Sequence, residues 1–190
     1  MPSAALDRED IDRLARLQER ILPGSALSRL GLHYLRSFFA YVERSPHELC
    51  LVERNRSGAI VAACVVSTSM SSLPRRLLRN TTLLIEAARH PRWLVDTLVH
   101  GGGRAGAEES ELLLLFTNEA ERGHGHGTQL IARAETELFR RGVDRYVVRT
   151  FDDPDDPALA FYLARGFNTV TTFQAFGRSF RLLTKQISNQ

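Results

Sequence analysis

The first quarter of the chain has the apolar spacing of two amphipathic helices. Apolar side chains recur three to four positions apart over residues 11–21, between a helix-capping residue type, Asp7, and the helix-breaking pair Pro23-Gly24. Residues 28–43 repeat this spacing on one face. We therefore expect two helices, each with one buried face.

After residue 48 the pattern changes to the short apolar and alternating runs of a β-sheet. The run at 112–116 is continuous, as in a central strand buried on both faces, and a turn at 55–58 predicts a hairpin. The strands that these patterns predict are residues 49–53, 59–67, 112–116, 145–151, 167–176 and 178–184.

Two more helices are expected between the later strands, at residues 127–141, capped by Gly142, and at 158–165. The order is then helices, hairpin, insert, strand, helix, strand, helix, hairpin. Such an order predicts an α+β fold with one strand–helix–strand crossover.

Length and composition are those of a chain that folds around one core. The 190 residues are 43% hydrophobic and 25% charged, and no repeat or linker divides them. We expect a single domain over residues 1–190, with a helical insert at about 71–100. The apolar spacing of this insert is less regular than that of the other predicted elements.

The net charge and the length of the apolar runs bear on whether the protein binds nucleic acid or a membrane. A net charge of +3 is too small to indicate nucleic acid binding, and no apolar run approaches the roughly 20 residues that span a bilayer. The start of the chain lacks the pattern of a signal peptide, and Cys50 and Cys64 lie in apolar stretches as reduced thiols would. We expect a cytoplasmic protein without membrane or nucleic acid partners.

A glycine-rich loop, Arg-Gly-His-Gly-His-Gly-Thr at residues 122–128, joins the central strand to a helix. Glycines let backbone N–H groups approach a ligand, and a helix start favours an anion, so the loop predicts a pyrophosphate cradle. A P-loop is excluded because no lysine follows Gly127. The dinucleotide fingerprint is excluded because Thr128 stands where a third glycine or alanine is needed.

Two segments carry a resemblance to a known family. Residues 122–127 fit Arg-x-x-Gly-x-Gly, and residues 158–167 fit Ala-x-x-Phe-Tyr-x-x-x-Gly-Phe. In this order, separated by a helix and a strand, they resemble the GNAT superfamily of acetyl-CoA-dependent N-acyltransferases. The resemblance implies a mixed, mostly antiparallel sheet with a central splayed parallel strand pair, flanked by helices.

The resemblance also implies acetyl-CoA as the acyl donor substrate, with its pantetheine arm between the strands at 112–117 and 145–150. The cofactor-binding residues that it implies are Phe116, Thr117, Arg122, Gly123, His124, Gly125, His126, Gly127 and Thr128. His124 and His126 could also be two metal ligands, but no third ligand stands at a suitable spacing, and we expect no metal.

In enzymes of this kind the acceptor amine attacks the thioester directly. Tyr162 matches the position of a phenol that protonates the leaving thiolate, although a tyrosine packed on the helix would look the same. Glu111 matches a frequent general base, although it could be an exposed strand-end carboxylate. The catalytic residues implied are therefore Tyr162 and Glu111.

The resemblance indicates the acyl donor more clearly than the acceptor. Residues 68–104 contain six arginines and two acidic residues, which suggests a small-molecule amine with an anionic or phosphorylated part. The aspartates after the strand at 145–151, at 152, 153, 155 and 156, could hold a cationic amine or only form a turn and a helix cap. Asp155 stands where the family often has asparagine, and a carboxylate suits a site near cofactor phosphates less well than an amide.

Several alternatives remain open at this point. They are peptide or protein N-acetylation, O-acylation, a longer acyl donor, and a non-catalytic module that binds CoA. A homodimer is also left open.

Overall fold

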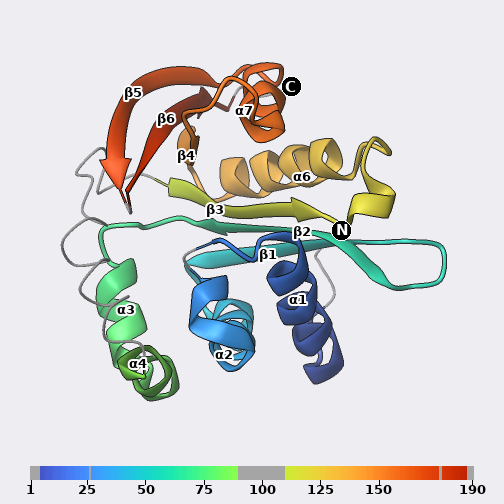
Figure 1. The fold of residues 1–190 in the computed structure, drawn as a ribbon, viewed down its shortest axis with the longest axis vertical. Coiled ribbons are helices and arrows are strands. Elements are labelled where there is room, and N and C mark those ends of the chain that lie inside the picture. The colour runs from blue at the N-terminus through green and yellow to red at the C-terminus, as the bar shows by residue number, and fades with distance from the viewer. Residues whose placement is uncertain (1–4, 26, 90–109, 176, 188–190) are drawn as a thin grey trace.

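The centre of the molecule is a six-stranded sheet in the order β1-β2-β3-β4-β6-β5 (Figure 1). The computed structural model describes residues 5–25, 27–89, 110–175 and 177–187. The strands are β1 (Glu48–Arg54), β2 (Ile60–Ser67), β3 (Ser110–Thr117), β4 (Arg145–Phe151), β5 (Asn168–Ala175) and β6 (Arg178–Gln186). Only β3 and β4 pair in parallel within this sheet, so the predicted mixed, mostly antiparallel arrangement is confirmed.

Helices cover both faces of the sheet. Those described are α1 (Arg8–Ile21), α2 (Gly31–Arg44), α3 (Leu73–Arg79), α4 (Thr81–Ala88), α6 (His126–Arg140) and α7 (Pro157–Leu163), with short 3-10 turns η1 (Ser28–Leu30) and η2 (Glu119–Glu121). Figure 1 shows α6 and α7 on one face and α1 to α4 on the other. None of the helices in the described residues has the length and apolar character needed to cross a membrane.

The observed elements follow the predicted ones closely, with two differences. The predicted helix from residue 28 begins as η1 and becomes α2 only at Gly31, whose φ of +83° interrupts the helical path. The predicted insert at 71–100 contains α3 and α4, while its residues 90–100 lie outside the described residues.

Each sheet face has its own hydrophobic core, as the alternation of side chains along a strand requires. Ala63 and Val65 of β2 face α1 and α2, whereas Cys64 and Val66 face α6 and α7. The start of α1 is fixed as predicted, because the Asp7 side chain accepts a hydrogen bond of 2.8 Å from the backbone N–H of Asp10.

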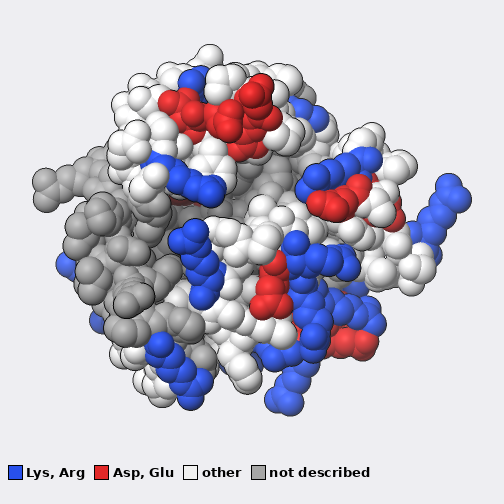
Figure 2. All heavy atoms as spheres, viewed as in Figure 1, with Lys and Arg blue, Asp and Glu red and all other residues white. Residues whose placement is uncertain are grey.

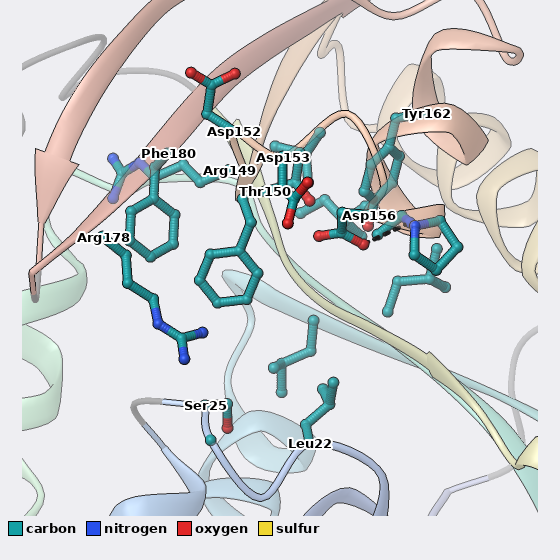
Figure 3. Close-up of a pocket in the computed structure, with 18 of the residues that line it drawn as sticks. Leu22, Ser25, Arg149, Thr150, Asp152, Asp153, Asp156, Tyr162, Arg178 and Phe180 are labelled. Carbon is teal, nitrogen blue, oxygen red and sulfur yellow. Dashed lines mark hydrogen bonds between the residues drawn. The ribbon is translucent and has the colours of Figure 1, made fainter.

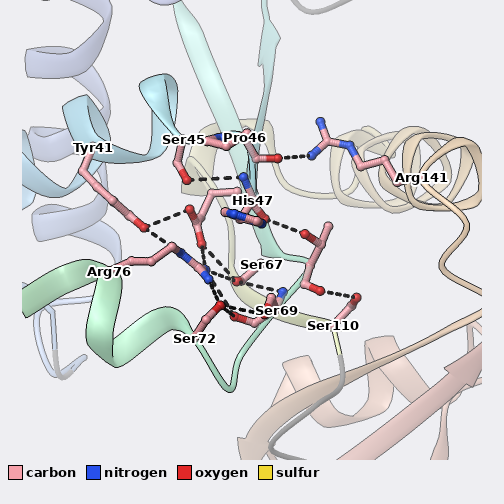
Figure 4. A network of polar contacts seen from close by, with 12 residues as sticks. Tyr41, Ser45, Pro46, His47, Ser67, Ser69, Ser72, Arg76, Ser110 and Arg141 are labelled. Carbon is pink, nitrogen blue, oxygen red and sulfur yellow. Dashed lines mark hydrogen bonds and ion pairs between the residues drawn. The ribbon is translucent and has the colours of Figure 1, made fainter. Parts of the chain in front are cut away.

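A buried polar network fastens α3 to the sheet (Figure 4). The Glu48 side chain, with no exposed surface, accepts hydrogen bonds from Arg76 of α3, from the Ser67 hydroxyl at 3.1 Å and from the Tyr41 hydroxyl at 3.0 Å. Arg76 also donates to the Ser69 carbonyl oxygen at 3.2 Å. The network thereby joins α2, α3, β1 and β2 beside the end of the sheet where β3 begins.

The parallel strands β3 and β4 separate after a short stretch of pairing. Leu112 and Val148 are the last paired residues, although both strands continue. At the same place the pairing of β3 with β2 steps from Leu112 to Leu114, which leaves Leu113 as a bulge. A bulge bends and twists its strand, so it contributes to the opening between β3 and β4. The splayed pair that the family resemblance implied is therefore present.

Candidate active site

The opening between β3 and β4 leads into the main pocket (Figure 3). Its walls come from the α1–η1 connection, the separated parts of β3 and β4, the β4–α7 connection and the start of β6. Its volume of about 1490 Å³ exceeds the roughly 300–1000 Å³ of a pocket for one drug-sized molecule. The pocket therefore has room for a cofactor arm and a second substrate.

The glycine loop has the backbone conformation of an anion cradle. Gly123 and Gly125 have φ of +82° and +84°, a region that residues with a Cβ rarely adopt. Gly125 is the N-cap of α6, and the first hydrogen bond of that helix is donated by the Gln129 N–H to the Gly125 carbonyl oxygen at 3.0 Å. The N–H groups of the preceding turn are thus free for an anion, which fits a pyrophosphate.

Gly127 differs from these two glycines, because α7 approaches it closely. A Cβ at this position would lie 3.2 Å from the Phe161 ring. The Arg165 guanidinium stacks 3.5 Å from the centroid of that ring and donates from Nε to the Thr128 hydroxyl at 3.1 Å. Arg165 therefore joins α7 to the first turn of α6, a contact that the sequence analysis missed.

The charged and imidazole side chains of the loop make loose contacts. Arg122 is 56% exposed and lies 3.8 Å from Glu119, so it remains accessible to a ligand. Nε2 of His126 lies 3.6 Å from a Glu121 carboxylate oxygen, and its buried Nδ1 has no hydrogen-bond partner among the described residues. Within the described residues, no three His, Cys, Asp or Glu side chains gather as a metal site would require.

Tyr162 lies in the pocket wall and points into it beside Asp156 (Figure 3). Its side chain is buried between Phe161 and Phe167, with ring centroids 5.4 and 5.3 Å away, and its hydroxyl makes no hydrogen bond to another described residue. Burial raises the pKa of the Tyr162 phenol, so the group stays protonated at neutral pH. A protonated phenol at this place can donate a proton.

Glu111 lies behind the pocket wall. Its buried carboxylate contacts Arg149 at 3.2 Å, and Arg149 lines the pocket whereas Glu111 does not. The contact is an ion pair without the alignment of a hydrogen bond. Burial raises the pKa of Glu111 and outweighs the opposing effect of Arg149. A raised pKa suits a base, but Glu111 can reach a substrate only through water or through Arg149.

The aspartates after β4 are engaged in local structure. Asp152 accepts from Nε of Arg181 at 2.8 Å, Asp156 caps α7 by accepting from the Ala158 N–H at 2.8 Å, and Asp153 accepts from the Asp155 N–H at 3.0 Å. The turn and cap interpretation is thus confirmed for Asp153 and Asp156.

The arginines of the pocket are mostly not those of the arginine-rich segment. Of that segment, Arg89 lines the pocket and Arg76 belongs to the Glu48 network, while Arg92 and Arg104 lie outside the described residues. The pocket also contains Arg29, Arg149 and Arg178, which the sequence analysis did not single out. Of these three arginines, strand alternation could have indicated only Arg149. It lies two residues after Val147, the partner of Glu111 in β4, and so on the same face of the sheet.

Both cysteines are free and buried. Cys50 belongs to the core under α1 and α2, and Cys64 to the core under α6 and α7. Burial raises the pKa of the Cys50 thiol to about 12, and burial likewise raises the pKa of Cys64. Neither thiol is therefore suited to act as a nucleophile.

The geometry of the loop and the splayed strands agrees with the comparison to known families. The profile of the acetyltransferase (GNAT) family matches residues 11–167. The chain belongs to this family. The predicted GNAT acetyltransferase is thus confirmed, and family membership supports acetyl-CoA binding. No curated protein matches the chain in a sequence search.

Solved structures show the same fold at low sequence identity. The ribosomal-protein-S18-alanine N-acetyltransferase from Escherichia coli is 15% identical, with a TM-score of 0.62 over 98% of this chain and 94% of that one. An aminoglycoside 6'-N-acetyltransferase complexed with coenzyme A is 13% identical, with a TM-score of 0.65 over 100% and 99%. These likenesses establish the GNAT fold and leave the acceptor undetermined.

Proposed function

We propose that this GNAT acetyltransferase moves an acetyl group from acetyl-CoA to the amine of a small molecule by direct attack. The observation that carries the proposal is one continuous pocket, which includes the opening between β3 and β4 and the Tyr162 side chain. The glycine cradle follows β3 along the chain, which supports a cofactor that extends from the cradle along β3.

The cofactor would be held mainly by backbone groups. The cradle at residues 122–128 would bind the pyrophosphate, and the edge of β3 that β4 leaves, near Phe116 and Thr117, would bind the pantetheine amides. An N–H of β3 would polarise the thioester carbonyl. Few specific side chains are needed for this half of the site.

In the proposed reaction the unprotonated amine attacks the thioester carbonyl carbon, the carbon–sulfur bond breaks, and the CoA thiolate takes a proton. Tyr162, which its raised pKa keeps protonated at neutral pH, would donate that proton. The proton lost by the acceptor ammonium would pass through water to Glu111, since the carboxylate does not line the pocket. The products are the N-acetyl amine and free CoA.

The experiment is an acetyl transfer assay on a panel of amines, with release of the CoA thiol and the mass of the product as readouts. The panel contains neutral monoamines, amines with a carboxylate or phosphate, a polyamine and a peptide with a free N-terminus. We expect turnover of small amines. Turnover of the peptide alone would overturn the proposal in favour of peptide N-acetylation.

Two further outcomes would also contradict the proposal. Acetyl-CoA binding without transfer to any amine would indicate a non-catalytic CoA-binding module. An ester product from a hydroxylated amine would indicate O-acylation.

We also propose a cytoplasmic location. The buried, unpaired thiols of Cys50 and Cys64 support it, because reduced cysteines are usual in that compartment.

A further inference from the structure

Besides Arg89, three arginines enter the main pocket from separate parts of the chain. Arg29 comes from η1, Arg149 from β4 and Arg178 from the start of β6. Figure 3 shows the Arg178 side chain extending toward the α1–η1 connection, on the side of Leu22 and Ser25. This side of the pocket lies opposite the α7 helix that carries Tyr162.

These arginines keep donors available for a ligand. The side chains of Arg29 and Arg178 make no ion pair or hydrogen bond with another described residue, although the Arg178 guanidinium lies 4.9 Å from the centroid of the Phe151 ring. Such stacking leaves the N–H groups at the edge of the guanidinium free. Among the described residues, Arg149 has one carboxylate partner, Glu111, which holds the guanidinium in the pocket wall.

The acidic groups of the pocket gather elsewhere. Asp153 and Asp156 lie beside Tyr162 at the start of α7, whereas the Asp152 carboxylate points away from the pocket (Figure 3). Figure 2 shows acidic side chains grouped over the β4–α7 connection, with separate basic side chains below them. The pocket therefore has an acidic side next to the general acid and a basic side across from it.

A ligand that matches both sides carries a positive and a negative group. Its ammonium would face the aspartates and Tyr162, where the thioester opening lies, and its anion would face the arginines. Guanidinium groups bind carboxylates and phosphates through paired hydrogen bonds, which are stronger than bonds between neutral groups. A polycationic amine would instead meet like charges on the basic side.

We propose that Arg29, Arg149 and Arg178 form the anion-binding side of the acceptor pocket, and that the acceptor is an amine with a carboxylate or a phosphate. The inference rests on the proposed function, because it specifies the acceptor of the same reaction.

The test compares two matched pairs of amines, β-alanine with β-alaninamide and phosphoethanolamine with ethanolamine. Each pair keeps the primary amine and removes the anion, so carboxylate and phosphate are tested separately. The ratio of kcat/KM within a pair is measured by CoA thiol release and expressed per concentration of unprotonated amine. We expect the anionic member of at least one pair to be preferred at least about tenfold, as for hydrogen bonds to charged groups.

Substitutions then assign the preference to the arginines. Arg149→Gln and Arg178→Gln should each reduce the ratio at least about threefold. Arg56→Gln, at an exposed residue of the β1–β2 turn, is the matched control and should keep the wild-type ratio. Equal or better use of the neutral amines by the wild type, or an unchanged ratio in both pocket variants, would overturn the inference.

A failure of the proposed function would look different, since none of the four amines would release thiol. Calorimetric titration of the four amines into the protein saturated with CoA would then decide the inference. Binding of the anionic members alone would support it, whereas equal or absent binding would overturn it.

Discussion

The cofactor cradle and the acceptor side of the pocket are built in different ways. The cradle is a contiguous segment in which two glycines with positive φ lead into α6, so backbone N–H groups at the helix start are available to an anion. The acceptor side combines side chains from η1, β4 and β6, which are far apart in the sequence. One is determined by local backbone conformation, and the other by the packing of distant elements.

This difference explains why a family keeps its cofactor while its acceptor varies. A backbone cradle tolerates many side chains as long as the glycines remain. Specificity for an acceptor depends on which side chains η1, β4 and β6 place in the pocket, and these side chains can change without altering the backbone of the cradle. The predictions below separate the two sides, from the largest expected effect to the smallest.

The largest effect should come from the network that fastens α3 to the sheet. Arg76→Met leaves the buried carboxylate of Glu48 without its cation, so the free energy of unfolding should fall by about 3 kcal/mol. Denaturant titration measures this, with Arg13→Met as the control because its ion pair with Glu9 is largely exposed. An equal effect in both variants would contradict the prediction.

The pH dependence gives a second measure of the same network. Burial alone would raise the pKa of Glu48, but hydrogen bonds from Ser45 and Arg76 lower it overall. A carboxyl with a lowered pKa stabilises the fold above its unfolded pKa and loses this contribution as pH falls through the folded pKa. The free energy of unfolding of the wild type should therefore exceed that of Arg76→Met by less as the pH is lowered.

The next effect tests how Glu111 acts. If it accepts the proton through water, Glu111→Gln should reduce kcat/KM about 100-fold for every amine. Because the pKa of Glu111 is raised, kcat/KM should fall on acidification, and this fall should occur at a higher pH than it would with an ordinary glutamate. The fall is the acidic limb of the pH profile. The limb should disappear in the variant. A retained limb with a reduced preference for anionic amines would show that Glu111 only positions Arg149.

A smaller effect is expected from the general acid. Tyr162→Phe removes the proton donor while keeping the ring between Phe161 and Phe167, so kcat should fall at least about tenfold with nearly intact CoA binding. Single-turnover rates and calorimetry measure the two quantities. Unchanged turnover would mean that another group protonates the thiolate.

The cradle itself gives the smallest predicted change. Gly125→Val places a Cβ-bearing residue at a φ of +84°, and a strain of about 1–2 kcal/mol should weaken acetyl-CoA binding about tenfold. Gly58→Val, at a φ of +82° in the β1–β2 turn, has the same backbone strain away from the site. Weaker acetyl-CoA binding in both variants would mean that strain acts through the whole fold.

Much of this molecule could be predicted from its sequence because the signals are local. Apolar spacing located α1 and α6, glycines located the cradle, and Asp7 marked a helix start, since each depends on residues only a few positions apart. The parallel strand pair and the family could be predicted because the two matching segments stand in a fixed order.

Only the tertiary structure decided which charged groups share the pocket. The arginine-rich segment suggested the anion-binding residues, yet Arg76 pairs with a buried carboxylate, and Arg29 and Arg178 enter the pocket from elsewhere. Glu111 likewise matched a catalytic position, but the register of β3 and β4 places it behind Arg149. A side chain's partners depend on strand register and on how distant connections pack, and neither leaves a periodic pattern in the sequence.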